Sequence, residues 1–251
     1  MSSKQEQPFS LSAGGDEKQG EAFVRHGAAD ESSPFVAPRE SAWALILEHT
    51  AKSLRRNGFG VSIAASLASA ADLVMHTLLP MSGAESVSFG GSMTVREAGL
   101  LEALKARPEL RVLDTFDASG GLEAMLELRR QALLSDLFLC SANALTREGA
   151  VIMVDGFGNR TAAVQFGPKK VILLVGRNKI CDSVEAGIAR IKGIAAPANG
   201  LRLNKNTPCT KTGRCMDCSS PERMCNCWSI IPRCGIKERI HVVLIDAEAG
   251  F

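Results

Sequence analysis

Short apolar runs alternate with longer amphipathic stretches along most of the chain. The apolar runs predict strands at 59–64, 86–89, 110–113, 138–141, 151–154, 171–175 and 240–245. Apolar residues spaced three or four positions apart predict helices over 41–57, 68–79, 94–106, 121–134 and 182–194. Strands that alternate with helices in this way predict an α/β fold, in which a mostly parallel sheet has helices on both faces.

Glycine, proline and capping residues mark where these elements end. Gly58 is expected to stop the first helix, and Pro80 is expected to end the second. Asp182 or Ser183 is the expected N-cap of the last helix, and Pro197 interrupts the chain after it.

Composition divides the chain into three parts. Residues 1–38 are rich in Ser, Gly, Glu, Gln and Pro and contain few apolar residues, which predicts a disordered tail. Residues 39–251 are expected to form one α/β domain. A cysteine-rich segment, residues 199–235, is expected as an insertion before the final strand.

Charge and hydropathy argue against a nucleic-acid-binding protein and against a membrane-spanning one. A net charge of +2 and the absence of Tyr argue against nucleic-acid binding. The apolar runs are too short and too interrupted to span a bilayer, and the N-terminus lacks the layout of a secretory signal. A cytoplasmic location is therefore expected, and in a reducing compartment clustered cysteines favour metal or redox chemistry over disulfides.

The first candidate site follows the predicted strand 151–154 and consists of polar and glycine residues. Open α/β folds place ligands at such strand ends. Between positions 160 and 179 there are five Lys or Arg and no Asp or Glu, which favours an anionic ligand. Arg160 is expected to bind a carboxylate, Asn159 a carbonyl and Asp155 a hydroxyl. The alternative is a Gly-Asn turn in which Asp155 forms an Asx turn and Arg160 a surface ion pair. The candidate substrate-binding residues of this loop are Asp155, Gly156, Gly158, Asn159 and Arg160.

The second candidate site lies where the strand 86–89 runs into the helix 94–106. Glycines allow close approach of the backbone to a ligand, and a helix start offers free N–H groups to an anion. The candidate residues are Gly90, Gly91, Ser92 and Thr94 for binding, with Glu97 as a candidate catalytic carboxylate. Thr94 and Glu97 also match a capping box, in which Glu97 serves only the helix start.

The third candidate site is a metal site in the cysteine-rich segment. Cys209, Cys215, Cys218 and Cys225 supply four thiols at a spacing that suits zinc or an iron–sulfur cluster without deciding between them. Lys and Arg between them would help to keep thiolates deprotonated.

Three long segments together resemble the lactate utilization (LUD) domain family, and in particular its stand-alone members with a cysteine-rich C-terminal segment. They are GGSMTVREAGLLEAL, VDGFGNRTAAVQFGPKKVILLVGRNKI and IAAPANGLRLNKNTPCTKTGRCMDCSSPERMCN. The resemblance implies a fold like that of ribose-5-phosphate isomerase and CoA transferases. It also implies a role in oxidising L-lactate to pyruvate with iron–sulfur partner subunits. In related transferases a Glu near a glycine loop acts as the nucleophile, which would correspond to Glu97.

Two functions from different classes follow. In the first, the α/β body binds a small anionic hydroxy or oxo acid as a subunit or accessory of lactate oxidation. In the second, the chain is a non-enzymatic interaction protein whose cysteines bind zinc or an iron–sulfur cluster. An enzyme acting on CoA or sugar phosphates rests on fold analogy alone and ranks last.

Overall fold

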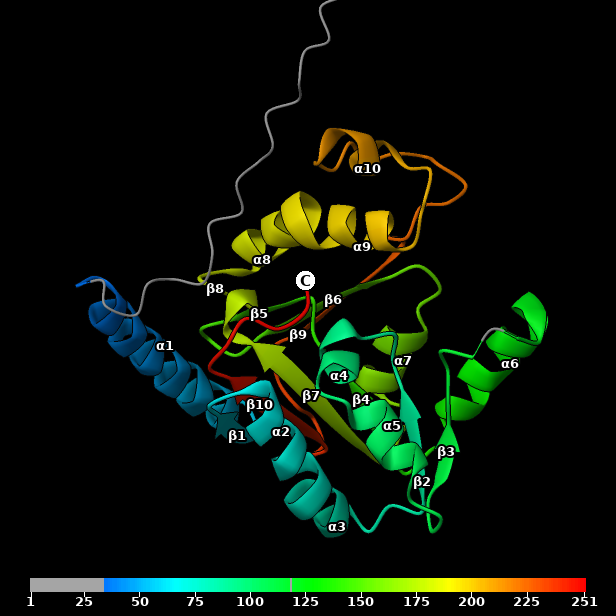
Figure 1. Cartoon of the computed structure of the whole chain (residues 1–251). Coiled ribbons are helices and arrows are strands. Elements are labelled where there is room, and N and C mark those ends of the chain that lie inside the picture. Colours follow the sequence, from blue (N-terminus) through cyan, green and yellow to red (C-terminus); the bar gives the residue numbers. More distant parts are fainter. Residues whose placement is uncertain (1–33, 118) are drawn as a thin grey trace, which may run out of the picture.

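The computed structural model describes residues 34–117 and 119–251, and its centre is a six-stranded sheet of order β1-β10-β7-β4-β2-β3 (Figure 1). Every neighbouring pair in this sheet is parallel. The carboxyl ends of all six strands therefore lie along one edge, where open α/β sheets bind ligands. The strands are β1 (Gly60–Ala64), β2 (Ser86–Phe89), β3 (Arg111–Leu113), β4 (Leu137–Cys140), β7 (Lys170–Gly176) and β10 (Ile240–Ile245).

Helices cover both faces of this sheet, as the sequence predicts. In the central strand β7, Leu173 packs with α1 (Val36–Arg56) and α7 (Asn159–Gln165), whereas Leu174 packs with helices of the opposite face. This alternation follows from side chains that point to opposite faces of a strand. The helices of the opposite face are α2 (Leu67–Leu73), α3 (Leu79–Ser82), α4 (Met93–Glu97) and α5 (Leu100–Lys105), and α6 (Gly121–Ala132) lies beside β2 and β3.

A second sheet has four strands in the order β8-β5-β6-β9. Residues of this sheet share one core cluster with α1 and α7. The strands are β5 (Ala144–Thr146), β6 (Val151–Asp155), β8 (Ile180–Cys181) and β9 (Cys227–Ile231). The assignment of 151–154 to the parallel sheet was wrong, because β6 is antiparallel to both β5 and β9. The run is buried on both faces in this position too, so an unbroken apolar strand looks alike in either sheet.

The outer face of the second sheet is covered by a helical stretch that runs from α8 (Val184–Arg190) through a π-helical turn (Ile191–Ala195) to α9 (Ala196–Arg202). Ser183 caps its start, in agreement with the sequence. Pro197 does not interrupt it, and Pro80 likewise lies within a continuous helical stretch after the π-helical turn Val74–Leu78. Each proline occupies the first turn of a new α-helical segment, where its missing N–H is tolerated.

The helix predicted over 94–106 is divided in two. Gly99 has a φ of 68°, in the left-handed region, and separates α4 from α5. Glycine reaches this conformation without the steric cost that other residues have, so the chain can turn here.

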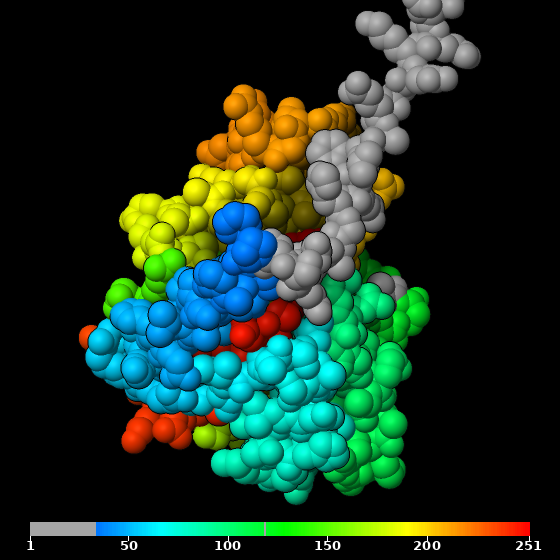
Figure 2. Space-filling model, turned by 60° about the vertical axis from the view of Figure 1, so that its left-hand side comes forward, coloured from blue at the N-terminus to red at the C-terminus, as the bar shows by residue number. Residues whose placement is uncertain are grey.

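The first helix begins within the stretch predicted as the tail. α1 begins at Val36, so residues 36–38 belong to the helix, and the prediction for residues 1–33 falls outside the described part. The cysteine-rich segment forms α10 (Pro208–Thr212) and then β9, which completes the second sheet. Figure 2 shows the part of this segment around α10 in orange, above the yellow helices α8 and α9. Within the described residues no helix has the length and apolar character needed to cross a membrane.

Candidate functional site

A cavity of about 450 Å³ lies at the carboxyl edge of the parallel sheet. Its floor comes from the segments that follow β2, β4 and β7, which are neighbours in the sheet. α6 contributes Met125 and Arg129 to one side. α9 and the cysteine-rich segment form a further wall, so the segment predicted as an insertion is part of the cavity lining.

The cavity brings together residues from both predicted glycine-containing loops. Gly91, Ser92 and Thr94 line it from the β2 side, and Asp155, Gly156, Asn159 and Arg160 line it from the end of β6. The two loops thus face the same space although more than sixty positions separate them in the sequence. Their part in binding a substrate stays a prediction.

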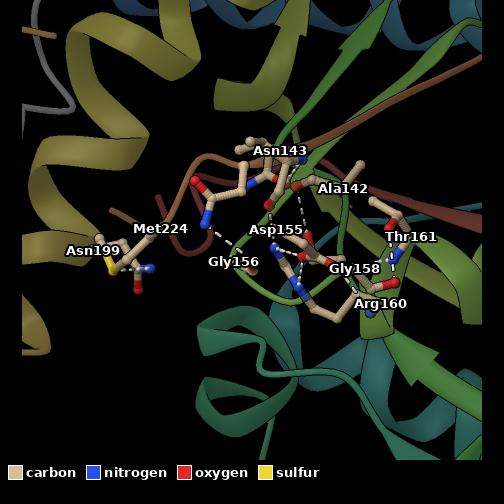
Figure 3. A network of polar contacts seen from close by, with 12 residues as sticks. Ala142, Asn143, Asp155, Gly156, Gly158, Arg160, Thr161, Asn199 and Met224 are labelled. Carbon is tan, nitrogen blue, oxygen red and sulfur yellow. Dashed lines mark hydrogen bonds and ion pairs between the residues drawn. The ribbon is translucent and has the colours of Figure 1, made fainter. Parts of the chain in front are cut away.

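Asp155 and Arg160 form a buried pair that fixes the start of α7 (Figure 3). The Asp155 carboxylate accepts hydrogen bonds from the Arg160 Nε at 2.6 Å and from the backbone N–H groups of Arg160 and Thr161 at 2.8 and 2.9 Å. Arg160 also donates to the Val154 carbonyl at 2.6 Å. The carboxylate thereby satisfies N–H groups that the first turn of a helix leaves free. Both charged groups are committed to each other and to the backbone.

Gly90 and Gly158 lie just outside the cavity lining, and the structure explains why each is glycine. Gly158 has a φ of 85° and forms the N-cap of α7. A Cβ atom on Gly90 would lie 2.8 Å from the Cβ of Cys140 and 2.9 Å from the Cγ of Arg160, closer than real side chains approach. Gly90 therefore makes room for the Arg160 side chain.

Ser92, not Thr94, caps α4, and Glu97 takes no part in that cap. The Ser92 hydroxyl accepts a hydrogen bond from the Val95 N–H. Glu97 accepts one from the Gly250 N–H at 3.0 Å and does not line the cavity. The predicted capping box was therefore wrong, because Glu97 binds the backbone of Gly250, beyond the end of β10. The catalytic role of Glu97 stays a prediction.

Three cavity arginines that the sequence analysis missed have no carboxylate partner among residues 34–117 and 119–251. They are Arg96, Arg129 and Arg202. The buried Nε of Arg129 has no hydrogen-bond partner in this part of the chain, and its guanidinium lies 5.4 Å from the ring centre of Phe157. Burial lowers the pKa of Arg202, and the like charges of Arg96 and Arg160 lower it further. Cations that face each other without counter-ions favour an anion in the space between them.

Most of the Lys and Arg residues between positions 160 and 179, by contrast, do not line the cavity. Lys169 pairs with Asp136, and Arg177 pairs with Glu40 and Asp246, all outside the cavity. Arg160 and Lys179 are the members of the run that line the cavity. Most of the Lys and Arg residues that line the cavity therefore come from elsewhere in the chain, and an anion site there stays a prediction.

The four candidate metal ligands lie on and beside the cavity wall. Cys209, Cys218 and Cys225 line the cavity. Burial raises the pKa of the Cys225 thiol, and the neighbouring Cys215 and Cys218 thiols raise it further, so these three sulfurs share one neighbourhood. In the described part of the chain, no group of three or more Cys, His, Asp or Glu side chains has the arrangement of metal ligands. The donor chemistry suits a soft metal ion.

The same segment holds the 155–158 loop in place. The Asn226 N–H donates to the Asp155 carbonyl at 2.9 Å, and the Asn226 side-chain amide donates to the Gly156 carbonyl at 3.2 Å. A Cβ on Gly158 would lie 3.4 Å from the Cys227 sulfur. Figure 3 shows Asn199 and Met224 on the far side of this loop, where an Asn199 N–H lies 3.8 Å from the Met224 sulfur.

Comparison with family models matches the LUD domain over residues 47–245, most of the described chain. The chain belongs to the LUD domain family. The recognition and the α/β fold class expected from the sequence are thereby confirmed.

Solved structures similar to this LUD domain are distant. A DUF162 family protein from Deinococcus radiodurans shares 16% identity over 81% of this chain and 98% of its own, with a TM-score of 0.44. The delta subunit of eIF2B from Chaetomium thermophilum shares 16% identity over 58% of this chain and 50% of its own, with a TM-score of 0.24. No curated protein matches the chain.

The site of this LUD domain has the chemical means to bind an anion and to react with it. Unpaired arginines can hold a carboxylate by paired hydrogen bonds. Lys179 adds a buried amine, which the sequence analysis counted only as one more positive charge. Asp155 is the one acidic side chain that lines the cavity in the described residues, and Arg160 already holds it.

Proposed function

We propose that the cavity binds a small organic anion, a 2-hydroxy or 2-oxo acid. The observation that carries the proposal is the set of cavity arginines without carboxylate partners in the described parts of the chain, Arg96, Arg129 and Arg202. Cations that line one cavity without counter-ions repel each other, and a bound carboxylate offsets this repulsion. Arg96 and Arg202 extend the positive surface, which favours an acid with a further polar oxygen.

Membership of the LUD domain family makes the chain a protein of the lactate-utilization type in general terms. On this basis the proposed acids are L-lactate and pyruvate, and the chain acts as a subunit or accessory of their interconversion. Oxidation of lactate releases electrons, which iron–sulfur partner subunits would accept. Glu97 would need to leave Gly250 to act on a bound acid.

Replacing Arg129 with Ala is expected to weaken binding of pyruvate or L-lactate by about tenfold or more, because a charge-assisted hydrogen bond to a carboxylate contributes about 1.5–3 kcal/mol. Isothermal titration calorimetry measures this. The matched control is Arg130→Ala on the same helix, since the Arg130 side chain is 68% exposed and pairs with Glu127. Absence of binding to the wild-type protein, or equal loss in both variants, would contradict the proposal.

A second candidate function is that of a non-enzymatic protein whose cysteines bind a metal for interaction with a partner. It is favoured because Arg160 already holds the one acidic side chain that lines the cavity in the described residues, and no histidine side chain lines it there. In either function Cys209, Cys215, Cys218 and Cys225 would hold the metal. Zinc would supply structural stabilisation, and an iron–sulfur cluster would supply electron transfer.

Metal analysis and an optical spectrum of anaerobically purified protein separate these functions. We expect bound metal in the wild type and a substantial loss in Cys218→Ser, with retention in Cys181→Ser, whose thiol lies in β8. Visible thiolate-to-iron absorption would favour the redox function, whereas colourless protein with zinc would favour the second. Metal-free wild-type protein would rule out a resident metal under both.

A further inference from the structure

Lys179 is a buried amine at the bottom of the cavity. β7 ends at Gly176, and the short 3₁₀ turn Arg177–Lys179 places Lys179 over the carboxyl edge of the sheet. The residue is 3% exposed yet lines the cavity. Lysines are almost never buried to this extent unless a carboxylate pairs with them, and no such ion pair occurs in the described residues.

The hydrogen bonds of Lys179 match a neutral amine. Its Nζ donates to the hydroxyl oxygens of Thr94 and Ser141, both at 2.9 Å. Those hydroxyls direct their own protons to the carbonyls of Ala249 and Ala142, each at 3.2 Å, so they act as acceptors toward Nζ. A neutral amine has two N–H groups and one lone pair. Both N–H groups are satisfied, and the lone pair remains free.

The charged surroundings act in the same direction. Burial lowers the pKa of Lys179 to about 7, and the nearby guanidinium groups of Arg190 and Arg160 lower it too. Glu97 and Cys140 are the neighbours that oppose this effect. At neutral pH a large share of the protein therefore carries Lys179 as a nucleophilic amine, as in enzymes that form Schiff bases.

We propose that Lys179 forms a covalent imine with the carbonyl carbon of a 2-oxo acid bound in the cavity. The Nζ lone pair attacks the carbonyl carbon to give a carbinolamine. The carbonyl oxygen then leaves as water with the two protons of the amine, and a carbon–nitrogen double bond remains. The step is reversible and changes no oxidation state. The unpaired arginines hold the carboxylate of the acid, and the Thr94 and Ser141 hydroxyls lie next to the reacting nitrogen, where they can relay protons.

This inference rests on the proposed anion site and deepens it, because it distinguishes oxo acids from hydroxy acids. A 2-hydroxy acid has no carbonyl at that carbon and cannot form the imine. The prediction is that oxo acids, unlike hydroxy acids, become attached to the protein.

Reductive trapping tests the proposal. The full-length protein is incubated with pyruvate and sodium cyanoborohydride, and intact mass and peptide mapping are recorded. We expect one adduct per chain, with the mass of the acid less one oxygen atom, located on Lys179 and abolished in Lys179→Met. The matched control is Lys170→Met, since Lys170 is exposed at the other end of β7. L-Lactate in place of pyruvate should give no adduct.

A pH series on the wild-type protein supplies a readout that needs no variant. The trapping rate should rise as the pH passes through about 7, because loss of a proton from Lys179 creates the nucleophile. A rate that rises only near the pKa of an exposed lysine, about 10.4, would overturn the proposal. An adduct spread over surface lysines, or undiminished in Lys179→Met, would overturn it as well. If calorimetry shows that pyruvate binds but no adduct forms, the imine proposal alone is contradicted. If pyruvate does not bind, the proposed anion site, on which the imine depends, is contradicted as well.

Discussion

Asp155→Ala is expected to lower the free energy of unfolding by about 3–5 kcal/mol, the cost of removing one partner from a buried ion pair. Asp155 is 3% exposed and accepts hydrogen bonds from the Arg160 side chain and from two backbone N–H groups of α7. Its removal leaves the Arg160 guanidinium, on a side chain that is only 16% exposed, without its carboxylate, and leaves the first turn of α7 uncapped. Asp155→Asn should cost less, because the amide oxygen still accepts.

Guanidinium chloride unfolding followed by circular dichroism measures this difference. The control is Glu127→Ala, which breaks the pair with Arg130 at a position in α6 where the Glu127 side chain is 54% exposed. Exposed pairs contribute about 0–1 kcal/mol, so this variant should unfold almost as the wild type does. Equal losses in the two variants would show that the buried pair does not organise the site.

Arg239→Met is expected to destabilise the protein by about 2–4 kcal/mol, because it leaves buried carbonyl groups without a donor. Arg239 is 5% exposed and donates to the carbonyls of Pro168 at 2.8 Å and Phe166 at 3.4 Å, and also to that of Val164. These carbonyls lie at and just beyond the C-terminal end of α7. A cation there satisfies groups that the end of a helix leaves free and complements the helix dipole.

The measurement is again the denaturant midpoint and slope, with Arg233→Met as the control because Arg233 is exposed before β10. Met keeps most of the apolar length of Arg, so the difference between the two variants isolates the lost hydrogen bonds. A change within about 0.5 kcal/mol in Arg239→Met, the range of ordinary surface substitutions, would contradict the capping role.

Both predictions concern α7, and α7 also shows what the sequence could not predict. A helix of seven residues is too short to be stable by propensity alone. It is held by Asp155 at one end and by Arg239, more than seventy positions later, at the other. Asp155 lies only four positions before the helix, but no local pattern indicates the distant Arg239, so the start of this helix was predicted as a loop.

The strands of the parallel sheet were predictable because each is a short, bounded apolar run, and β7 and β10 lie where these runs predict. β9 was missed because Cys227–Ile231 lies in the cysteine-rich segment, which was interpreted only as an insertion with a candidate metal site. The assignment of β6 to a sheet was wrong because burial on both faces does not identify the neighbours of a strand.

The candidate site was predictable as a region rather than as a set of residues. Glycines and polar residues after β2 and β6 marked the two loops that meet at the cavity. The sequence does not indicate that Arg129 and Arg202 face a ligand, since only packing decides which side of their helices lines the cavity. Lys179 was visible as a positive charge, but its burial between two hydroxyls follows from the fold.

The most direct test of the anion cavity is a crystal structure of the protein grown with saturating pyruvate. We expect the carboxylate inside the cavity, with an oxygen about 3 Å from a guanidinium nitrogen of Arg129. A structure in which the cavity holds solvent alone, while pyruvate is absent or bound elsewhere, would contradict it.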